Sequence, residues 1–181
     1  MKFKDTILTF EDDKIVTDDG KTIMMDWETP IMEKSAEYIC QSKGDILEIG
    51  FGMGICSDFI QAQGVNSHTI VEIHPQVIEK LKAWAEDKDN VIIVEGDWIS
   101  VELGTYDGIF IDTYGGENWD KFKEFALSKA KSGARVTYWN VDLAENEHGF
   151  DNISHEDVPI VPEDESHIWY DNIYHLPKVV I

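Results

Sequence analysis

The fold is decided by residues 45–54, which read Asp45-Ile46-Leu47-Glu48-Ile49-Gly50-Phe51-Gly52-Met53-Gly54. The pattern predicts a short apolar strand over 45–49, a turn with three glycines, and a helix to about residue 63. Glycine permits a tight turn and lets ligand atoms approach the backbone. The stretch therefore favours a nucleoside-binding turn, although a plain strand-to-helix connection shows the same glycines.

The same alternation continues on both sides of this turn. Further strands are expected over 69–72, 91–95, 108–112 and 135–140. Helices are expected from Thr29-Pro30 to about residue 42, over 75–87, and over 119–131, where Gly133 would close the last one. Short apolar strands that alternate with helices predict an α/β fold, with a parallel sheet and helices on both faces.

The two ends of the chain differ from this core. A hairpin of residues 7–10 and 14–17, with a turn at 18–20, makes residues 1–28 a small appendage or lid. Residues 142–166 are acidic and are expected to be mostly loop, before a final pair of strands over 168–176 and 178–181. We predict one domain over 1–181: the appendage, a cofactor-binding core over 29–140, and an acidic loop with a closing hairpin over 141–181.

Charge narrows the classes of partner. The 181 residues hold 15 Lys and Arg against 36 Asp and Glu, a net charge of −21, with Arg135 the single arginine. Such a chain should be repelled by nucleic acids and anionic membranes, whereas a small cationic ligand suits it. No apolar run approaches the ~20 residues of a membrane helix, and the first residues do not resemble a signal peptide.

Cysteine and histidine give no sign of a metal site. Cys40 and Cys56 have neither disulfide-framework nor zinc spacing, which favours a reduced, cytoplasmic setting. The six histidines also lack metal-ligand spacing, and we expect all of them in surface or loop positions: His68, His74, His148, His155, His167 and His175. The sequence leaves a monomer and a homodimer equally open.

Acidic residues beside the glycine turn point to a particular cofactor. Glu72 ends the next strand 22 residues after Gly50, where a carboxylate can accept hydrogen bonds from both ribose hydroxyls; the alternative is a solvated strand-end carboxylate. Glu48 disfavours a pyrophosphate and favours the amino group and sulfonium of S-adenosylmethionine. Asp97 and Trp98 follow the third strand and could hold adenine, although Trp98 could equally be a core residue.

Two further carboxylates stand where an acceptor would bind. Asp112 ends the strand over 108–112, and ligands of open α/β sheets bind outside the carboxyl ends of the strands. Glu28 precedes the first helix, where an acid favoured by the helix dipole is also common.

Together these residues carry a resemblance that covers about two thirds of the chain. Residues 27–32, 47–54, 70–72 and 112–114 resemble the guanidinoacetate N-methyltransferase family and its arginine-methylating relatives; they read Trp-Glu-Thr-Pro-Ile-Met, Leu-Glu-Ile-Gly-Phe-Gly-Met-Gly, Ile-Val-Glu and Asp-Thr-Tyr. The resemblance implies a single-domain, Rossmann-like class I methyltransferase sheet, mostly parallel with a C-terminal antiparallel hairpin. It also implies that S-adenosyl-L-methionine is the cofactor, S-adenosyl-L-homocysteine its product, and a small cationic guanidino compound the substrate.

The resemblance also assigns roles to residues. It places the methionine part of the cofactor near Met24, Gly50 and Gly52, the ribose on Glu72, and adenine near Gly96, Asp97 and Trp98. It makes Glu28 and Asp112 the catalytic residues that bind the guanidinium. The remaining expected substrate contacts are Tyr114, Asn140, Val141 and Asp142.

One departure from the family bears on the substrate. Asp142 stands where the family has Thr, and a like-charge contact at ~4 Å costs about 4 kcal/mol at an effective dielectric of 20. With no cation expected nearby, acceptors with a neutral or cationic tail should compete with guanidinoacetate. Two alternatives stay open: an aminopropyltransferase-like enzyme acting on a polyamine, and a non-catalytic protein that binds S-adenosylmethionine or another nucleoside.

Overall fold

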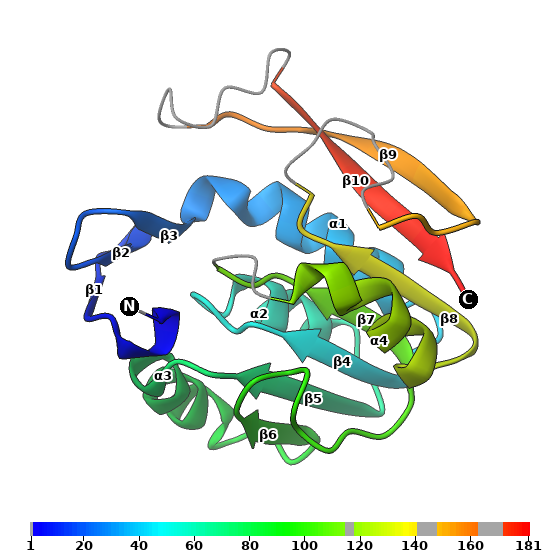
Figure 1. The fold of residues 1–181 in the computed structure, drawn as a ribbon, viewed down its shortest axis with the longest axis horizontal. Helices are drawn as coiled ribbons and strands as arrows, with labels where there is room; N and C mark the ends of the chain where they lie inside the picture. The colour runs from blue at the N-terminus through cyan, green and yellow to red at the C-terminus, as the bar shows by residue number, and fades with distance from the viewer. Residues whose placement is uncertain (1, 115–117, 141–147, 163–171) are drawn as a thin grey trace.

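The computed structural model describes residues 2–114, 118–140, 148–162 and 172–181. Within these ranges, seven strands form one sheet in the order β6-β5-β4-β7-β8-β10-β9 (Figure 1). Five of them are parallel neighbours, and β10 and β9 are added antiparallel at one edge. The strands are β4 (Asp45–Ile49), β5 (Ser67–Glu72), β6 (Val91–Glu95), β7 (Tyr106–Ile111), β8 (Ala130–Tyr138), β9 (Ile153–Pro159) and β10 (Ile173–Val180). The expected mostly parallel sheet is confirmed.

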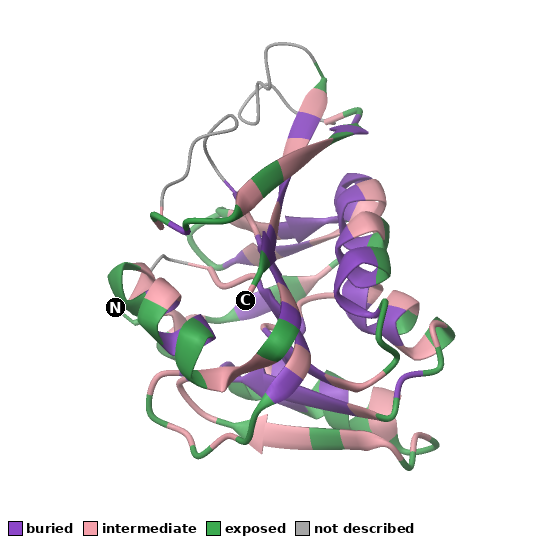
Figure 2. Ribbon diagram, turned by 90° about the vertical axis from the view of Figure 1, so that its right-hand side faces the viewer, coloured by how far each residue is buried: buried purple, intermediate pink, exposed green. Residues whose placement is uncertain are grey.

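Helices cover both faces of this sheet, as the sequence predicted. One face carries Ile46 and Phe110, which pack with α1 (Thr29–Ile39) and α2 (Ile55–Ala62), while α3 (Pro75–Ala85) lies farther along the same face. The other face carries Leu47 and Ile109, which pack against α4 (Phe122–Lys129). The central strands β4, β5 and β7 are buried along most of their length, whereas the edge strand β6 has no buried residue (Figure 2).

The topology places a crevice at the carboxyl ends of β4 and β7. These strands are neighbours, but β5 continues the sheet on one side of them and β8 on the other. Helices that follow the two halves therefore leave on opposite faces, which opens a crevice where ligands of such sheets bind. Gly50, Glu72 and Asp112 all stand at this end of the sheet.

The N-terminal appendage is a small sheet of three antiparallel strands, β1 (Leu8–Phe10), β2 (Lys14–Thr17) and β3 (Thr22–Met25). The hairpin of β1 and β2 was predicted from the sequence, and β3 was not. Gln76 on α3 attaches the appendage, because its side chain accepts from Leu8 N–H at 2.8 Å and donates to Leu8 O at 3.0 Å. Residues 2–25 thus lie beside the carboxyl ends of the strands (Figure 1).

The C-terminal prediction was wrong in its strand boundaries. β9 lies in the segment expected to be loop, and β10 is one strand that runs through Pro177 rather than two strands around it. β9 is an edge strand with a mixed burial pattern, so it lacks the apolar alternation that reveals a strand. Pro177 fits because only Val179 and Val180 pair with β8, while the Thr137 hydroxyl donates to Pro177 O at 2.6 Å.

The helix expected over 119–131 is also shorter than predicted. A 3-10 turn over Trp119–Lys121 precedes α4, which ends at Lys129, and Gly133 lies inside β8 instead of closing a helix. Gly133 donates its N–H to Ile181 O, so the chain end pairs with this part of the strand. None of the described helices is long and apolar enough to cross a membrane.

Candidate active site

A cavity of about 1060 Å³ opens at the carboxyl ends of β4, β5, β6 and β7. Ten of the residues that the sequence assigned to cofactor or substrate line it: Met24, Glu48, Gly50, Gly52, Glu72, Gly96, Asp97, Trp98, Asp112 and Tyr114. Residues scattered over 90 positions of sequence therefore meet in one place, because the parallel strands bring their ends to one edge of the sheet.

The glycine turn is closed in by its neighbours. Gly50 has φ +90° and Gly52 φ +54°, a backbone region that favours glycine. A Cβ on Gly50 would collide with the carbonyl oxygen of Asp112, and one on Gly52 would lie 2.5 Å from the sulfur of Met24. Met53 N–H also points to that sulfur at 3.3 Å. The turn thus leaves bare backbone facing the cavity, with Met24 beside it.

Glu72 is a fixed acceptor at the end of β5. Its Oε2 accepts from Phe51 N–H at 2.9 Å, and its Oε1 accepts from the N–H groups of Ile73 and His74, both at 2.8 Å. The residue is 6% exposed, so the alternative of a solvated strand-end carboxylate is wrong. The three backbone donors leave one acceptor position open, on Oε2, where a hydroxyl of a ribose could donate.

Glu48 has one satisfied oxygen and one open oxygen. Its Oε2 accepts from Ser57 Oγ at 2.5 Å and lies 2.8 Å from His68 Nε2. Its Oε1 is buried and has no hydrogen-bond partner among the described residues. A buried acceptor without a donor is rare in folded proteins. Because Glu48 lines the cavity, this unpartnered oxygen fits an N–H or ammonium group of a ligand such as the amino group of S-adenosylmethionine.

His68 contradicts the expectation that all the histidines lie at the surface or in loops, because it is fully buried near the start of β5. His74 does lie in a loop, just beyond the end of β5, although it is only 1% exposed. Neither has the spacing of a metal ligand, but a buried histidine can also serve as an internal hydrogen-bond donor.

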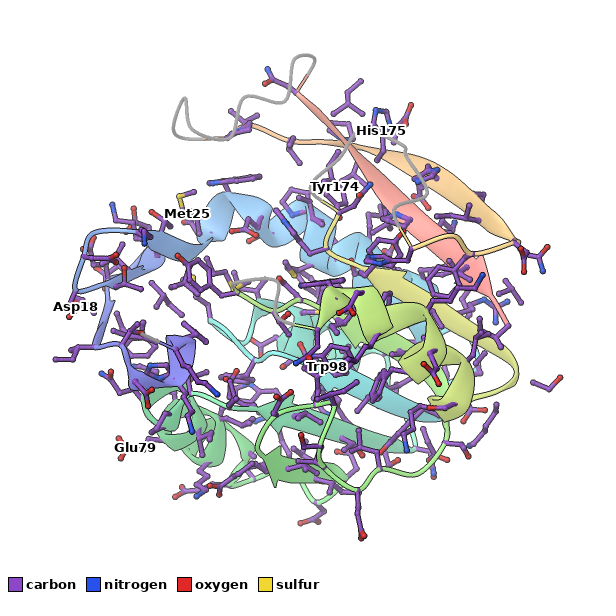
Figure 3. The ribbon with its side chains drawn as sticks, in the orientation of Figure 1. Asp18, Met25, Glu79, Trp98, Tyr174 and His175 are labelled. Carbon is purple, nitrogen blue, oxygen red and sulfur yellow. The ribbon has the colours of Figure 1, made fainter. Side chains whose placement is uncertain are left out.

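Trp98 satisfies both alternatives that the sequence left open. It is 6% exposed and packs edge-to-face on Phe125 with ring centroids 4.7 Å apart, as a core residue does, yet it also lines the cavity. Figure 3 places it beneath α4, in the interior of the molecule. Its neighbour Asp97 accepts from Ile99 N–H at 3.2 Å.

Asp112 and Glu28 form a pair of acids with raised pKa values. Burial, with smaller contributions from the charges of Glu48 and Glu72, raises the pKa of Asp112 to about 7. Burial and then the charge of Asp112 raise the pKa of Glu28 to about 8, although its carboxylate accepts from Met25 N–H at 2.8 Å. Asp112 lines the cavity, whereas Glu28 is buried, at 7% exposed, and is not among the residues that line it. Two acids whose charged forms are disfavoured by burial suit a bound cation.

Of the expected substrate contacts at residues 140–142, only Asn140 lies among the described residues. Asn140 is buried, donates its N–H to the Tyr174 hydroxyl at 2.7 Å, and does not line the cavity. Tyr174, labelled in Figure 3, stands on β10 and in turn donates to Tyr138 O at 3.2 Å. Val141 and Asp142 lie outside the described residues.

The appendage adds residues that the sequence analysis missed. Phe3 lines the cavity, and its ring lies 5.0 Å from that of His74 and 5.2 Å from that of Tyr114. Lys21 also lines the cavity, and its ammonium lies 2.8 Å from Asp19. The expectation that no cation faces the far end of the acceptor stays a prediction, because Asp142, beside which that end was expected, lies outside the described residues.

These features define a class, the S-adenosylmethionine-dependent methyltransferases. The sequence matches the family model of guanidinoacetate N-methyltransferase over residues 2–148, and the chain belongs to that family. It is also 38% identical over 133 residues to protein arginine N-methyltransferase 2 of Aspergillus fumigatus, a match that covers 68% of this chain and 31% of that protein. The chain thus spans about a third of the length of that relative.

Solved structures agree with the fold. A putative methyltransferase complexed with S-adenosylhomocysteine has a TM-score of 0.64 at 15% identity, covering 100% of this chain and 57% of that one. Spermidine synthase of Thermotoga maritima has a TM-score of 0.65 at 14% identity, covering 97% and 72%. At such identities the likeness supports the fold alone, so it does not favour aminopropyl transfer. The cofactor of the class is S-adenosylmethionine.

Proposed function

We propose that this chain methylates a nitrogen of a guanidino group, with a small guanidinoacetate-like compound as acceptor. The observation that carries the proposal is the pair Asp112 and Glu28, whose pKa values are raised to about 7 and about 8 beside the cavity. Acids whose charged forms are disfavoured by burial gain most from a bound cation. A planar guanidinium offers several N–H donors to two carboxylates at once.

The cofactor has a site of its own in this proposal. Glu72 would accept a hydrogen bond from the ribose, and the unpartnered oxygen of Glu48 would accept one from the amino group. The backbone of Gly50 and Gly52 would lie against the methionine part. When bound, S-adenosylmethionine supplies a methyl group on a sulfonium. Asp97 and Trp98 would hold the adenine at the far end of the same cavity.

Asp112 would serve as the proton acceptor. A guanidinium with a pKa of roughly 12.5–13.8, taking arginine as the model, costs about 7–9 kcal/mol to deprotonate at pH 7. Proton loss is therefore expected only as the nitrogen–methyl bond forms and the carbon–sulfur bond breaks, and the proton then passes to a carboxylate. A carboxylate whose pKa lies near 7 is better matched to this task than one near 4.

An arginine side chain of a protein is the second candidate acceptor. It has the same guanidinium, and the relative in Aspergillus fumigatus is named a protein arginine N-methyltransferase. The two candidates differ in the group attached to the guanidinium, which is a short acidic tail in one and a polypeptide in the other. The overall charge of −21 disfavours nucleic acid for either one.

The test is product detection by mass spectrometry after incubation with S-adenosylmethionine and a panel of guanidinoacetate, an amine-tailed guanidine and an arginine peptide. Asp112→Asn should slow methylation at least ~10²-fold, whereas Asp151→Asn, a change at a carboxylate that is 95% exposed, should not. Putrescine with decarboxylated S-adenosylmethionine tests the aminopropyltransferase alternative. Cofactor binding without any methylated product would support the non-catalytic alternative and overturn the proposal.

A further inference from the structure

Behind the open oxygen of Glu48 lies a buried hydrogen-bond chain that the proposed reaction does not use. Glu48 is 1% exposed, and Ser57 and His68 are fully buried. Ser57 and His68 both contact the same carboxylate oxygen, Oε2, at 2.5 and 2.8 Å. Gln61 extends the chain, with its Nε2 at 3.1 Å from His68 Nδ1.

The fold explains why these side chains meet. Glu48 pairs with Ile70 in the parallel register of β4 and β5, so His68 lies diagonally beside Glu48 on the same face of the sheet. α2 covers that face, and Ser57 and Gln61 are four residues apart on it, which places them on one side of the helix.

The direction of each hydrogen bond is set by the donors available. The Gln61 amide nitrogen is a donor, so His68 Nδ1 accepts and the ring proton resides on Nε2. His68 Nε2–H and the Ser57 hydroxyl then both donate to Oε2 of Glu48. The second oxygen, Oε1, keeps its full acceptor capacity and is buried at the cavity wall without a partner among the described residues.

We infer that His68 and Ser57 are positioning residues for the cofactor: by holding one oxygen of Glu48 they aim the other at the α-ammonium of S-adenosylmethionine. Neither residue lines the cavity, so both act through Glu48. This inference rests on the proposed function, which gives Glu48 the amino group of the cofactor. A carboxylate held by two buried donors has one rotamer and loses little freedom when the ligand binds.

A pair of ligands separates positioning from general damage to the fold. S-adenosylhomocysteine has the amino acid part that Glu48 would bind, and 5′-methylthioadenosine lacks it but has the same adenosine. A hydrogen bond to a charged group changes affinity roughly 10- to 150-fold. We expect His68→Leu to weaken the binding of S-adenosylhomocysteine about tenfold or more in calorimetry. The affinity for methylthioadenosine should change less than about twofold.

Three further variants complete the test. His68→Gln, whose amide can donate to Glu48 in place of Nε2–H, should restore most of the affinity. Ser57→Ala should weaken the binding of S-adenosylhomocysteine but not that of methylthioadenosine. This variant keeps the inference testable if His68→Leu does not fold. Thr137→Val is the matched control, because it removes a buried hydroxyl that donates to Pro177 O, away from the cavity. It should change neither ligand's affinity.

The outcomes distinguish the two proposals. Selective loss with S-adenosylhomocysteine, rescued by glutamine, supports the inference. Equal losses for both ligands, or no loss with either His68→Leu or Ser57→Ala, would overturn it while leaving the cofactor site in place. If the unmutated protein binds both ligands equally well, Glu48 does not bind the amino group, and the cofactor arrangement under the proposed function fails as well.

Discussion

Raising the pH from 6 to 8 should strongly tighten the binding of a guanidinium acceptor. The pKa of Asp112 is raised to about 7 and that of Glu28 to about 8, so both carry their protons at pH 6 and neither acid can then pair with a cation. The guanidinium keeps its own charge over this range. Affinity should therefore rise with pH, because the ionised pair is the form that binds.

The size of the effect depends on the fraction of protein in which both acids are ionised. Taken as independent groups, that fraction is roughly 0.001 at pH 6 and roughly 0.5 at pH 8, so the apparent dissociation constant should fall roughly 500-fold. Glu28→Gln leaves only Asp112 to titrate and should reduce the change to roughly tenfold. At pH 7, binding should release about 1.4 protons from the two acids of the unmutated protein.

Isothermal calorimetry with ethylguanidine in the presence of S-adenosylhomocysteine measures both quantities, since ethylguanidine has no other group that titrates in this range. Titrations in two buffers with different ionisation enthalpies give the number of protons released. An acceptor affinity that stays level between pH 6 and 8, without proton release, would refute the assignment of Asp112 and Glu28 as the guanidinium ligands.

The remaining predictions concern individual side chains of the cavity. Asp112→Asn should lower turnover at least ~10²-fold, the size typical of general base catalysis. It should also stabilise the fold above pH 7. A carboxyl whose pKa is raised on folding loses stability as pH rises from about 4 to about 7, and the amide escapes this loss, which is at most about 4 kcal/mol. Thermal unfolding at pH 5 and 8.5 checks the sign, and an equal shift at both pH values would contradict it. Glu72→Gln keeps an oxygen for Phe51 N–H but loses the charge, so it should weaken the binding of S-adenosylhomocysteine about 10-fold or more in calorimetry. Unchanged affinity in the folded variant would show that Glu72 does not bind the ribose. Gly52→Ala should displace Met24 and lower the affinity for S-adenosylhomocysteine. Gly20→Ala is the control: Gly20 has φ +82° and no neighbour within 4 Å, so the change has a similar backbone cost of about 1 kcal/mol and does not touch the cavity. Equal ligand affinities for the two glycine variants would show that Met24 does not contact the cofactor.

The central part of the fold could be predicted because its signals are local. The strand, glycine turn and helix over residues 45–62 are consecutive in the sequence, and each has the expected residue types. The carboxylates at 72 and 112 were found because strand ends can be recognised from a run of apolar residues. Parallel topology then brings those ends to one edge, which is why Glu72 and Asp112 share a cavity.

The parts that could not be predicted depend on contacts distant in sequence. β9 has a mixed burial pattern and becomes a strand by pairing with β10, which runs through Pro177. Phe3 belongs to the site because His74 and Tyr114 lie next to it in space, over 70 and 110 residues away. His68 was expected at the surface because no pattern in a single sequence reveals an internal hydrogen-bond partner.

The four acids of the site differ in how the protein compensates them, and this difference suggests an order of binding. Glu72 accepts three backbone N–H groups, and Glu48 accepts from Ser57 and His68, so the acids assigned to the cofactor are held before any ligand arrives. Asp112 and Glu28 have raised pKa values, and the charges of Glu48 and Glu72 contribute to that of Asp112. A cationic cofactor bound between these charges would weaken their repulsion and help Asp112 to ionise. Cofactor binding should therefore prepare the acceptor site, and acceptor affinity at pH 7 should be higher with a sulfonium cofactor analogue than with neutral-sulfur S-adenosylhomocysteine.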